Sequence, residues 1–103
     1  MTKKHIVIIG GGYGGLASAA LLSASGNEVT VLEKNEQLGG RAGQLVQDGF
    51  RFDTGPSWYL MPEVFEQFYK LIGRNVRDEL SLVKLQPGYS VFFPDMSRVT
   101  ITG

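Results

Sequence analysis

Cysteine is absent from this 103-residue chain, histidine occurs once, and positive and negative charges balance to a formal net charge of zero. Without cysteine the chain can form no disulfide, no thiolate metal site and no cysteine nucleophile, which fits a reducing compartment. With His5 as the single histidine, a multi-histidine metal site is impossible, and we expect no metal. The balanced charge gives no electrostatic reason to expect nucleic-acid binding.

Long apolar runs are also absent. The apolar run that follows the N-terminal residues, 6–9, is too short for the core of a signal peptide or for a membrane span. No internal repeat or low-complexity segment is present. The length allows one small domain with one hydrophobic core.

Glycine, in contrast, is abundant, and it is concentrated directly after the first apolar run. Residues 6–9 are all branched and apolar, which predicts a strand buried on both faces, as in a parallel sheet. Gly10, Gly12 and Gly15 then fit the pattern G-x-G-x-x-G. In that pattern the first glycine permits a tight turn, the second lets a phosphate approach the backbone, and the third lets the next helix pack close to the strand.

The segments that follow supply the structural context which this glycine pattern requires. Residues 14–25 carry a small-residue face and predict a helix on a sheet, which Gly26 ends. Residues 28–32 predict a second strand, and Glu33 comes 18 residues after Gly15. An acid at this spacing accepts hydrogen bonds from a ribose 2′-hydroxyl, and its charge argues against NADP. The N-terminus of the helix would bind the pyrophosphate. The alternative is an ordinary strand–helix–strand unit with Glu33 as a solvated loop charge.

Two further glycine-containing stretches follow. Gly39, Gly40 and Arg41 predict backbone close to a ligand with a guanidinium beside it, suited to pyrophosphate or to carbonyl oxygens; the alternative is a flexible loop with a surface arginine. Asp48-Gly49 between two short alternating runs predicts a hairpin over residues 44–52. The hairpin leads into a turn at residues 55–57. This turn could place bare backbone against a flat ring; the alternative is that it only carries the chain out of the hairpin.

The second half of the chain has a different pattern. Pro62 predicts the first turn of a helix that Gly73 ends. The helix carries a stripe of aromatic and apolar side chains, which we expect to pack in the core. The minority alternative is that the stripe forms the wall of a channel for a long apolar substrate. Residues 74–80 predict a polar connector or a short helical turn. Strands are predicted at residues 82–86, 89–93 and 98–102, with a turn at 94–97 between the last two.

Three pieces of the chain together resemble a known family. IVIIGGGYGGLASAALLSASGNEVTVLEKNEQLGGRAG, GFRFDTGPSWYLMPEVFEQFYKLIG and YSVFFPDMSRVTI resemble the amino-terminal segment of FAD-dependent amine oxidase-like flavoproteins. Among these, the chain is most similar to bacterial-type phytoene and diapophytoene desaturases, the carotenoid desaturases. The first piece is shared by many flavoproteins, whereas the other two narrow the resemblance to the desaturases.

The resemblance implies a fold and a set of cofactor-binding residues. The fold class is α/β: a partial Rossmann-like FAD-binding unit, then antiparallel hairpins and one helix, as a fragment of a larger two-domain flavoprotein. Residues 1–57 would be the N-terminal part of the FAD-binding domain, and residues 58–103 the start of the substrate domain. The residues expected to bind FAD are Gly10, Gly12, Tyr13, Gly14, Gly15, Glu33, Lys34, Gly40, Arg41, Gly55, Pro56 and Ser57.

The resemblance also implies a reaction and a location. The full-length enzyme would transfer a hydride from a saturated carbon–carbon unit of a polyisoprenoid to flavin, from the cytoplasm and in peripheral contact with the inner face of the membrane. Two alternatives stay open: another amine oxidase-like flavoenzyme acting on amines or nucleotide sugars, or a non-catalytic dinucleotide-binding piece. No acid, base or nucleophile can be named, so we expect no catalysis by these residues alone. Open sheet edges and uncovered apolar faces predict self-association of the fragment.

Overall fold

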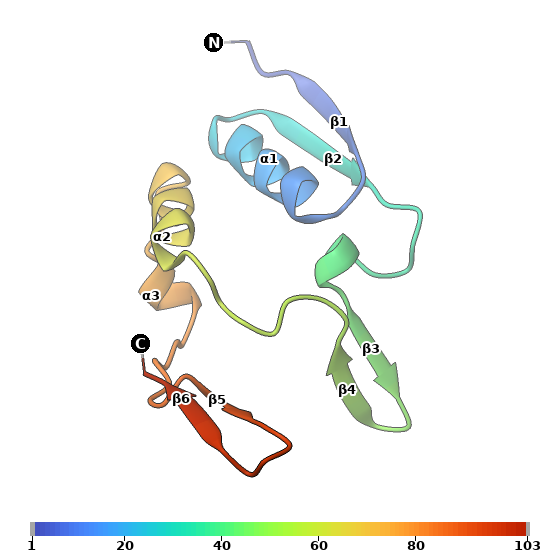
Figure 1. Cartoon of the computed structure of the whole chain (residues 1–103). Helices are drawn as coiled ribbons and strands as arrows, with labels where there is room; N and C mark the ends of the chain where they lie inside the picture. The colour runs from blue at the N-terminus through green and yellow to red at the C-terminus, as the bar shows by residue number, and fades with distance from the viewer. Residues whose placement is uncertain (1, 103) are drawn as a thin grey trace.

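The computed structural model describes residues 2–102 and shows an elongated chain of helices and short strand pairs, 65 × 32 × 21 Å in extent (Figure 1). Each of its three sheets has two strands. In chain order the elements are β1 (His5–Ile9), α1 (Tyr13–Ala24), β2 (Glu28–Leu32), the 3-10 turn η1 (Gly40–Ala42), β3 (Gln44–Gln47), β4 (Phe50–Asp53), α2 (Pro62–Leu71), α3 (Val76–Glu79), β5 (Tyr89–Phe92) and β6 (Arg98–Ile101).

The N-terminal unit is a parallel strand pair with a crossover helix. β1 pairs with β2 in parallel, with Ile6 opposite Val29 and Ile8 opposite Val31. These four side chains are half-buried on the face that α1 covers, because branched apolar residues pack well on a pleated surface. The helix and both strands lie within a residue of their predicted bounds, which confirms the strand–helix–strand unit.

The prediction that β1 is buried on both faces is wrong for this chain. Ile9 is 88% exposed and Val7 is 51% exposed. Both point away from α1, since successive side chains of a strand alternate between faces. Within residues 2–102 no helix lies on that second face, so half of the strand's apolar surface has no cover.

The first hairpin forms where Asp-Gly predicts it. β3 and β4 pair antiparallel, and Gln47 lies opposite Phe50 across a two-residue turn. Both turn residues have left-handed backbone, with φ of 51° at Asp48 and 84° at Gly49. That is the geometry that the favoured two-residue hairpin turn requires, and Asp and Gly are among the residues that adopt it at low cost.

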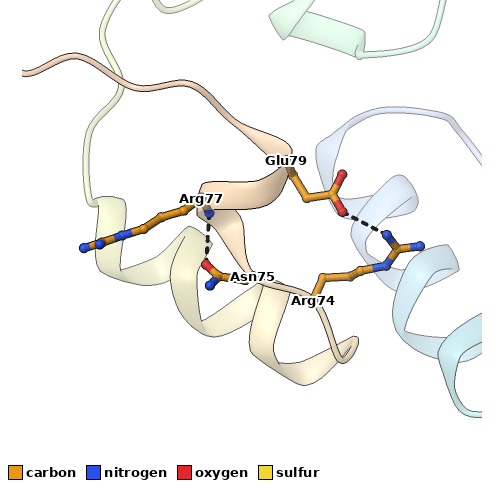
Figure 2. A network of polar contacts seen from close by, with 4 residues as sticks. All are labelled: Arg74, Asn75, Arg77 and Glu79. Carbon is orange, nitrogen blue, oxygen red and sulfur yellow. Dashed lines mark hydrogen bonds and ion pairs between the residues drawn. The ribbon is translucent and has the colours of Figure 1, made fainter.

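The helical pair α2–α3 follows. α2 begins at Pro62 as predicted and ends before Gly73, whose φ is 74°. The short α3 then forms within the predicted connector, because the side chain of Asn75 caps it by accepting a hydrogen bond from the backbone N–H of Arg77 at 3.0 Å. Figure 2 shows this cap beside the ion pair of Arg74 and Glu79, whose charged atoms are 3.0 Å apart.

The last region contains one hairpin and one segment without strand pairing. β5 and β6 pair antiparallel around the predicted turn, with Tyr89 opposite Ile101. The strand predicted at residues 82–86 is wrong: this stretch is in no helix or strand, and Val83 is 80% exposed. Its apolar residues have the composition of a strand, but no neighbouring strand within residues 2–102 supplies the ladder of hydrogen bonds that a strand needs.

The hydrophobic core is small. Among the described residues, Val76 is the only apolar side chain that is almost fully buried, at 7% exposure. Large side chains such as Phe50 and Phe92 are 67% and 72% exposed. Residues 2–102 contain no helix that combines the length and the apolar character needed to cross a bilayer.

Candidate dinucleotide-binding site

The glycine-rich loop between β1 and α1 forms a bare backbone turn at the N-terminus of a helix. Gly10 has a φ of 101°, which favours glycine, and its N–H donates to the carbonyl of Leu32 at 2.7 Å. Gly12 is the N-cap of α1 and makes no side-chain capping bond. The first N–H groups of a helix have no partner inside it and carry the positive end of its dipole. The loop therefore offers an anion site at the start of α1.

Gly15 has the packing role that the pattern predicts. A Cβ built on Gly15 would overlap the carbonyl oxygen of Gly10 and would lie 3.1 Å from the carbon of that carbonyl. It would also come within 3.5 Å of the side chain of Ile8. Only glycine lets α1 approach β1 this closely.

Glu33 lies at the mouth of this loop, directly after β2. Its Oε2 accepts a hydrogen bond from the backbone N–H of Gly11 at 2.6 Å, and its Oε1 accepts one from the N–H of Asn35 at 2.9 Å. The bond from Asn35 and then the bond from Gly11 hold the pKa of the Glu33 carboxyl below its ordinary value, against a smaller opposing effect of burial. The side chain is therefore a fixed anion beside the loop. Its role toward a ribose stays a prediction, and sequence reasoning missed its bond to Gly11.

The Gly39-Gly40-Arg41 stretch packs against the glycine-rich loop between β1 and α1. The N–H of Gly39 donates to the carbonyl of Gly11 at 2.8 Å, and Gly39 forms a parallel bridge with Gly12. A Cβ on Gly40, whose φ is 60°, would lie 3.2 Å from the Cα of Gly12. This backbone contact brings Arg41 close to the helix start. Lys34, another predicted site residue, is exposed next to Glu33.

The turn at residues 55–57 completes the cluster. The N–H of Thr54 donates to the carbonyl of Gly43 at 3.0 Å, and a Cβ on Gly55 would overlap the carbonyl oxygen of Arg41. Three glycine stretches that are distant in sequence thus meet around η1. Two of the predicted positions, Pro56 and Ser57, open onto an adjoining groove.

That groove is about 520 Å³ and is lined mainly by apolar and aromatic groups. Sequence reasoning named four of its lining residues, and the others come from η1 and the residue after it, the end of β4, the 58–61 segment and α2. The full lining is Tyr13, Ala42, Gly43, Asp53, Gly55, Pro56, Ser57, Trp58, Tyr59, Leu60, Met61 and Phe65. The aromatic residues around position 58 are the signal in the sequence that could have indicated this wall.

Aromatic contacts hold the outer wall of the groove. The rings of Tyr59 and Phe65 have centroids 4.6 Å apart, and those of Trp58 and Tyr89 are 4.7 Å apart, which ties the groove to β5. Burial, followed by nearby Tyr69, raises the pKa of the Tyr59 hydroxyl, which stays neutral at ordinary pH. The groove is thus a mainly apolar surface, with Asp53 as the one charged residue of its lining, beside an anion site, a combination suited to a dinucleotide with a flat ring.

A second hollow, of about 310 Å³, lies between α2 and α3 and is not part of this cluster. Its lining holds three basic residues, Lys70, Arg74 and Arg77, together with Glu66, and Arg74 is already paired with Glu79 (Figure 2). Within residues 2–102 no group of three histidine, aspartate or glutamate side chains is placed to hold a metal ion.

The chain matches the family described as NAD(P)-binding Rossmann-like domain over residues 8–74, and it belongs to that family. This class of domain binds a dinucleotide at the loop described above.

Several similar relatives are carotenoid desaturases. They include a carotenoid 3,4-desaturase of Haloarcula japonica, 50% identical over 103 residues, and a zeta-carotene-forming phytoene desaturase of Myxococcus xanthus, 48% identical over 99 residues. These matches cover 100% and 96% of this chain but 21% and 19% of the relatives. A 4,4′-diapophytoene desaturase of Staphylococcus aureus is 43% identical over 93% of the chain and 19% of its own length. The resemblance to phytoene and diapophytoene desaturases is confirmed.

The chain thus spans about one fifth of the length of these relatives. Among solved structures, a crystal structure of an oxidoreductase from Methanosarcina mazei is 46% identical, with a TM-score of 0.46, and the match covers 52% of this chain and 13% of that one.

Proposed function

We propose that this chain binds the ADP half of FAD and belongs to an oxidoreductase that introduces double bonds into a carotenoid or related polyisoprenoid. The observation that carries the proposal is the identity of 43–50% to three carotenoid desaturases along nearly the whole chain. The family description covers dinucleotides in general, and we propose FAD among them because the chain resembles FAD-dependent flavoproteins.

The residues present fit the adenosine diphosphate part of this cofactor. A Cβ on Gly14 would meet nothing within 4 Å, so the outer face of the loop has room for a pyrophosphate. Each carboxylate oxygen of Glu33 accepts one backbone N–H and retains capacity for a ribose hydroxyl. Arg41 would add a positive charge beside the phosphates, and Lys34 would add another at the edge.

The groove fits the flavin end of the same molecule. Gly55, Pro56 and Ser57 would face the ring, while Tyr13 and Tyr59 would form apolar walls that exclude water. When bound, the flavin supplies the acceptor for a hydride from a carbon–hydrogen bond. The described side chains would bind and orient the cofactor, and we assign none of them a proton-transfer role.

The first test is a titration of the 103-residue chain with FAD, ADP, NAD and NADP, followed by calorimetry. We expect saturable binding of ADP and FAD, weaker binding of NADP because Glu33 repels a 2′-phosphate, and at least a tenfold loss with Glu33→Ala. Gly88→Ala is the control, since its Cβ would make only an ordinary contact at 3.4 Å with the carbonyl oxygen of Ile101, and Gly88 lies neither on the glycine loop nor in the groove lining. Absence of saturable binding to the wild-type chain would contradict the proposal.

The second test addresses the reaction and uses the full-length protein with FAD and phytoene in lipid vesicles. New absorbance from a lengthened conjugated system is the expected result. Turnover of amines or nucleotide sugars, with none of phytoene, would instead favour the other amine oxidase-like activities.

Our proposals for location and partners follow from the same assignment. A polyisoprenoid substrate resides in the bilayer, so we propose a cytoplasmic protein in peripheral contact with the membrane, and flotation of the full-length protein with vesicles tests this. For the chain alone, the exposed Ile9 and Phe50 favour self-association, which sedimentation at several concentrations would detect.

A further inference from the structure

The backbone conformation at Gly55 is one that other residues also adopt, so conformation does not explain why glycine is present. Its φ lies outside the left-handed region, unlike those of Gly39 and Gly40. A side chain at position 55 is excluded for a different reason, which is the lack of space for a Cβ.

The group that occupies this space is the backbone of η1. A Cβ on Gly55 would overlap the carbonyl oxygen of Arg41 and would lie 2.8 Å from the Cα of Ala42. Backbone atoms cannot rotate away as the end of a flexible side chain can, so a substitution must push η1 and the 53–57 segment apart. The bond from the N–H of Thr54 to the carbonyl of Gly43, at 3.0 Å, holds the two segments in this register.

The displaced turn is the one that lies on the glycine loop. Gly40 lies against Gly12, with a hypothetical Cβ 3.2 Å from the Cα of Gly12, and Gly39 bonds to Gly11. Backbone contacts therefore run without a break from Gly55 through η1 to the helix start. Within residues 2–102 Arg41 forms no ion pair, so its guanidinium is available to an anion at that helix start.

We propose that Gly55 is a positioning residue for Arg41: its missing Cβ lets η1 sit against the 53–57 segment, and this places the Arg41 guanidinium beside the diphosphate of the bound dinucleotide. Gly55 thus acts on the phosphate end of the ligand through Arg41, in addition to any contact with the ring. The proposal rests on the proposed function, because it takes the glycine loop as the diphosphate site.

The test compares ADP with adenosine, which has no phosphate, as ligands of the wild-type chain and its variants. Gly55→Ala should weaken ADP binding roughly tenfold, the loss expected when a charge-assisted hydrogen bond is removed, and leave adenosine binding unchanged. Arg41→Ala should give a similar loss, and the double variant should lose no more than Arg41→Ala alone, because both changes remove one interaction. The loss should shrink as salt is added. Gly88→Ala is the control and should bind both ligands as the wild type does.

A second variant covers the case in which Gly55→Ala fails to fold. Gly43→Ala presses on the same turn more gently, since its Cβ would lie 3.2 Å from the carbonyl oxygen of Gly40 and 3.5 Å from the hydroxyl of Thr54. It should also weaken ADP selectively, by a smaller factor.

Three results would overturn the inference. Unchanged ADP affinity in Gly55→Ala, or in Gly43→Ala if only that variant folds, would show that η1 tolerates the displacement. Losses that multiply in the double variant, or an equal loss of adenosine, would show a general effect on the fold. A wild-type chain that binds no ADP would overturn the proposed function, and the inference with it. A wild-type chain that binds ADP, with variants that behave otherwise than expected, would overturn the inference alone.

Discussion

The adjacent glycines at the start of α1 offer a matched test of the packing argument. Gly14 and Gly15 both lie in the first turn of the same helix, but a Cβ on Gly14 would meet nothing within 4 Å, whereas one on Gly15 would overlap the carbonyl oxygen of Gly10. Alanine at either position removes the backbone freedom of glycine in the unfolded chain, which favours the helix by up to about 1 kcal/mol. Because this gain is common to both variants, their difference isolates the steric cost.

The steric cost can be set from the structure. The nearest atoms that the new Cβ meets belong to the backbone carbonyl of Gly10, directly after β1, so α1 must move away from the strand pair or the loop must distort. Overpacking of this kind costs roughly 1–3 kcal/mol. Gly14→Ala should therefore stabilise the unit by up to about 1 kcal/mol, and Gly15→Ala should be about 1–3 kcal/mol less stable than Gly14→Ala. That difference is roughly a 5- to 150-fold change in the equilibrium for opening of the helix.

Amide hydrogen exchange of α1 in the absence of ligand measures this opening directly, and it needs no global unfolding transition. We expect slower exchange along α1 in Gly14→Ala and faster exchange in Gly15→Ala. Exchange in the β5–β6 hairpin should be the same in both, as an internal reference. Equal protection of α1 in the two variants would refute the close approach of helix and strand, and with it the reason for the third motif glycine.

Three further predictions follow from local geometry. The pKa of Glu33 in the folded chain is lowered from its ordinary value of 4.5. The stabilisation that the Glu33 carboxylate gives to the loop is therefore present above pH 4.5 and is lost as the pH falls through the lower folded-state pKa. Glu33→Gln should remove this pH dependence from the hydrogen exchange of the Gly11 amide. The Ser97 side chain, followed by its backbone N–H, lowers the pKa of Asp95, so Ser97→Ala should raise that pKa in an NMR titration while Asp95 remains in its turn. Gly49→Ala should destabilise the β3–β4 hairpin by about 1–2 kcal/mol, measured by exchange of the strand amides, because its φ of 84° is unfavourable for alanine.

Local patterns in the sequence predicted those elements whose cause is local. The Asp48-Gly49 turn, the start of α2 at Pro62 and its end before Gly73 each depend on the conformational preference of one or two residues. The strand expected at residues 82–86 did not form, because strand formation depends on a neighbouring strand as well as on composition.

For the candidate site, the sequence indicated the three glycine stretches and the acid, but only four of the residues that line the groove and none of the contacts between them. The spacing of Gly15 and Glu33 predicted that the acid lies beside the loop, since parallel strands end at the same edge of a sheet. It did not predict that Glu33 accepts a hydrogen bond from Gly11, or that Trp58 and Phe65 line the neighbouring groove. Those contacts depend on side-chain positions and on the path of the chain between distant segments.

Local sequence patterns were enough to predict the strand–helix–strand unit, its glycine-rich turn and the family to which the chain belongs, because a glycine pattern, helix periodicity and one acid at fixed spacing are properties of neighbouring residues. The folded chain was needed to show that Gly12, Gly40 and Gly55 belong to one continuous set of backbone contacts around Arg41. Their separation in sequence does not show that they lie close together. The reason why glycine is required at these positions is seen only when the backbone that would meet a Cβ is known.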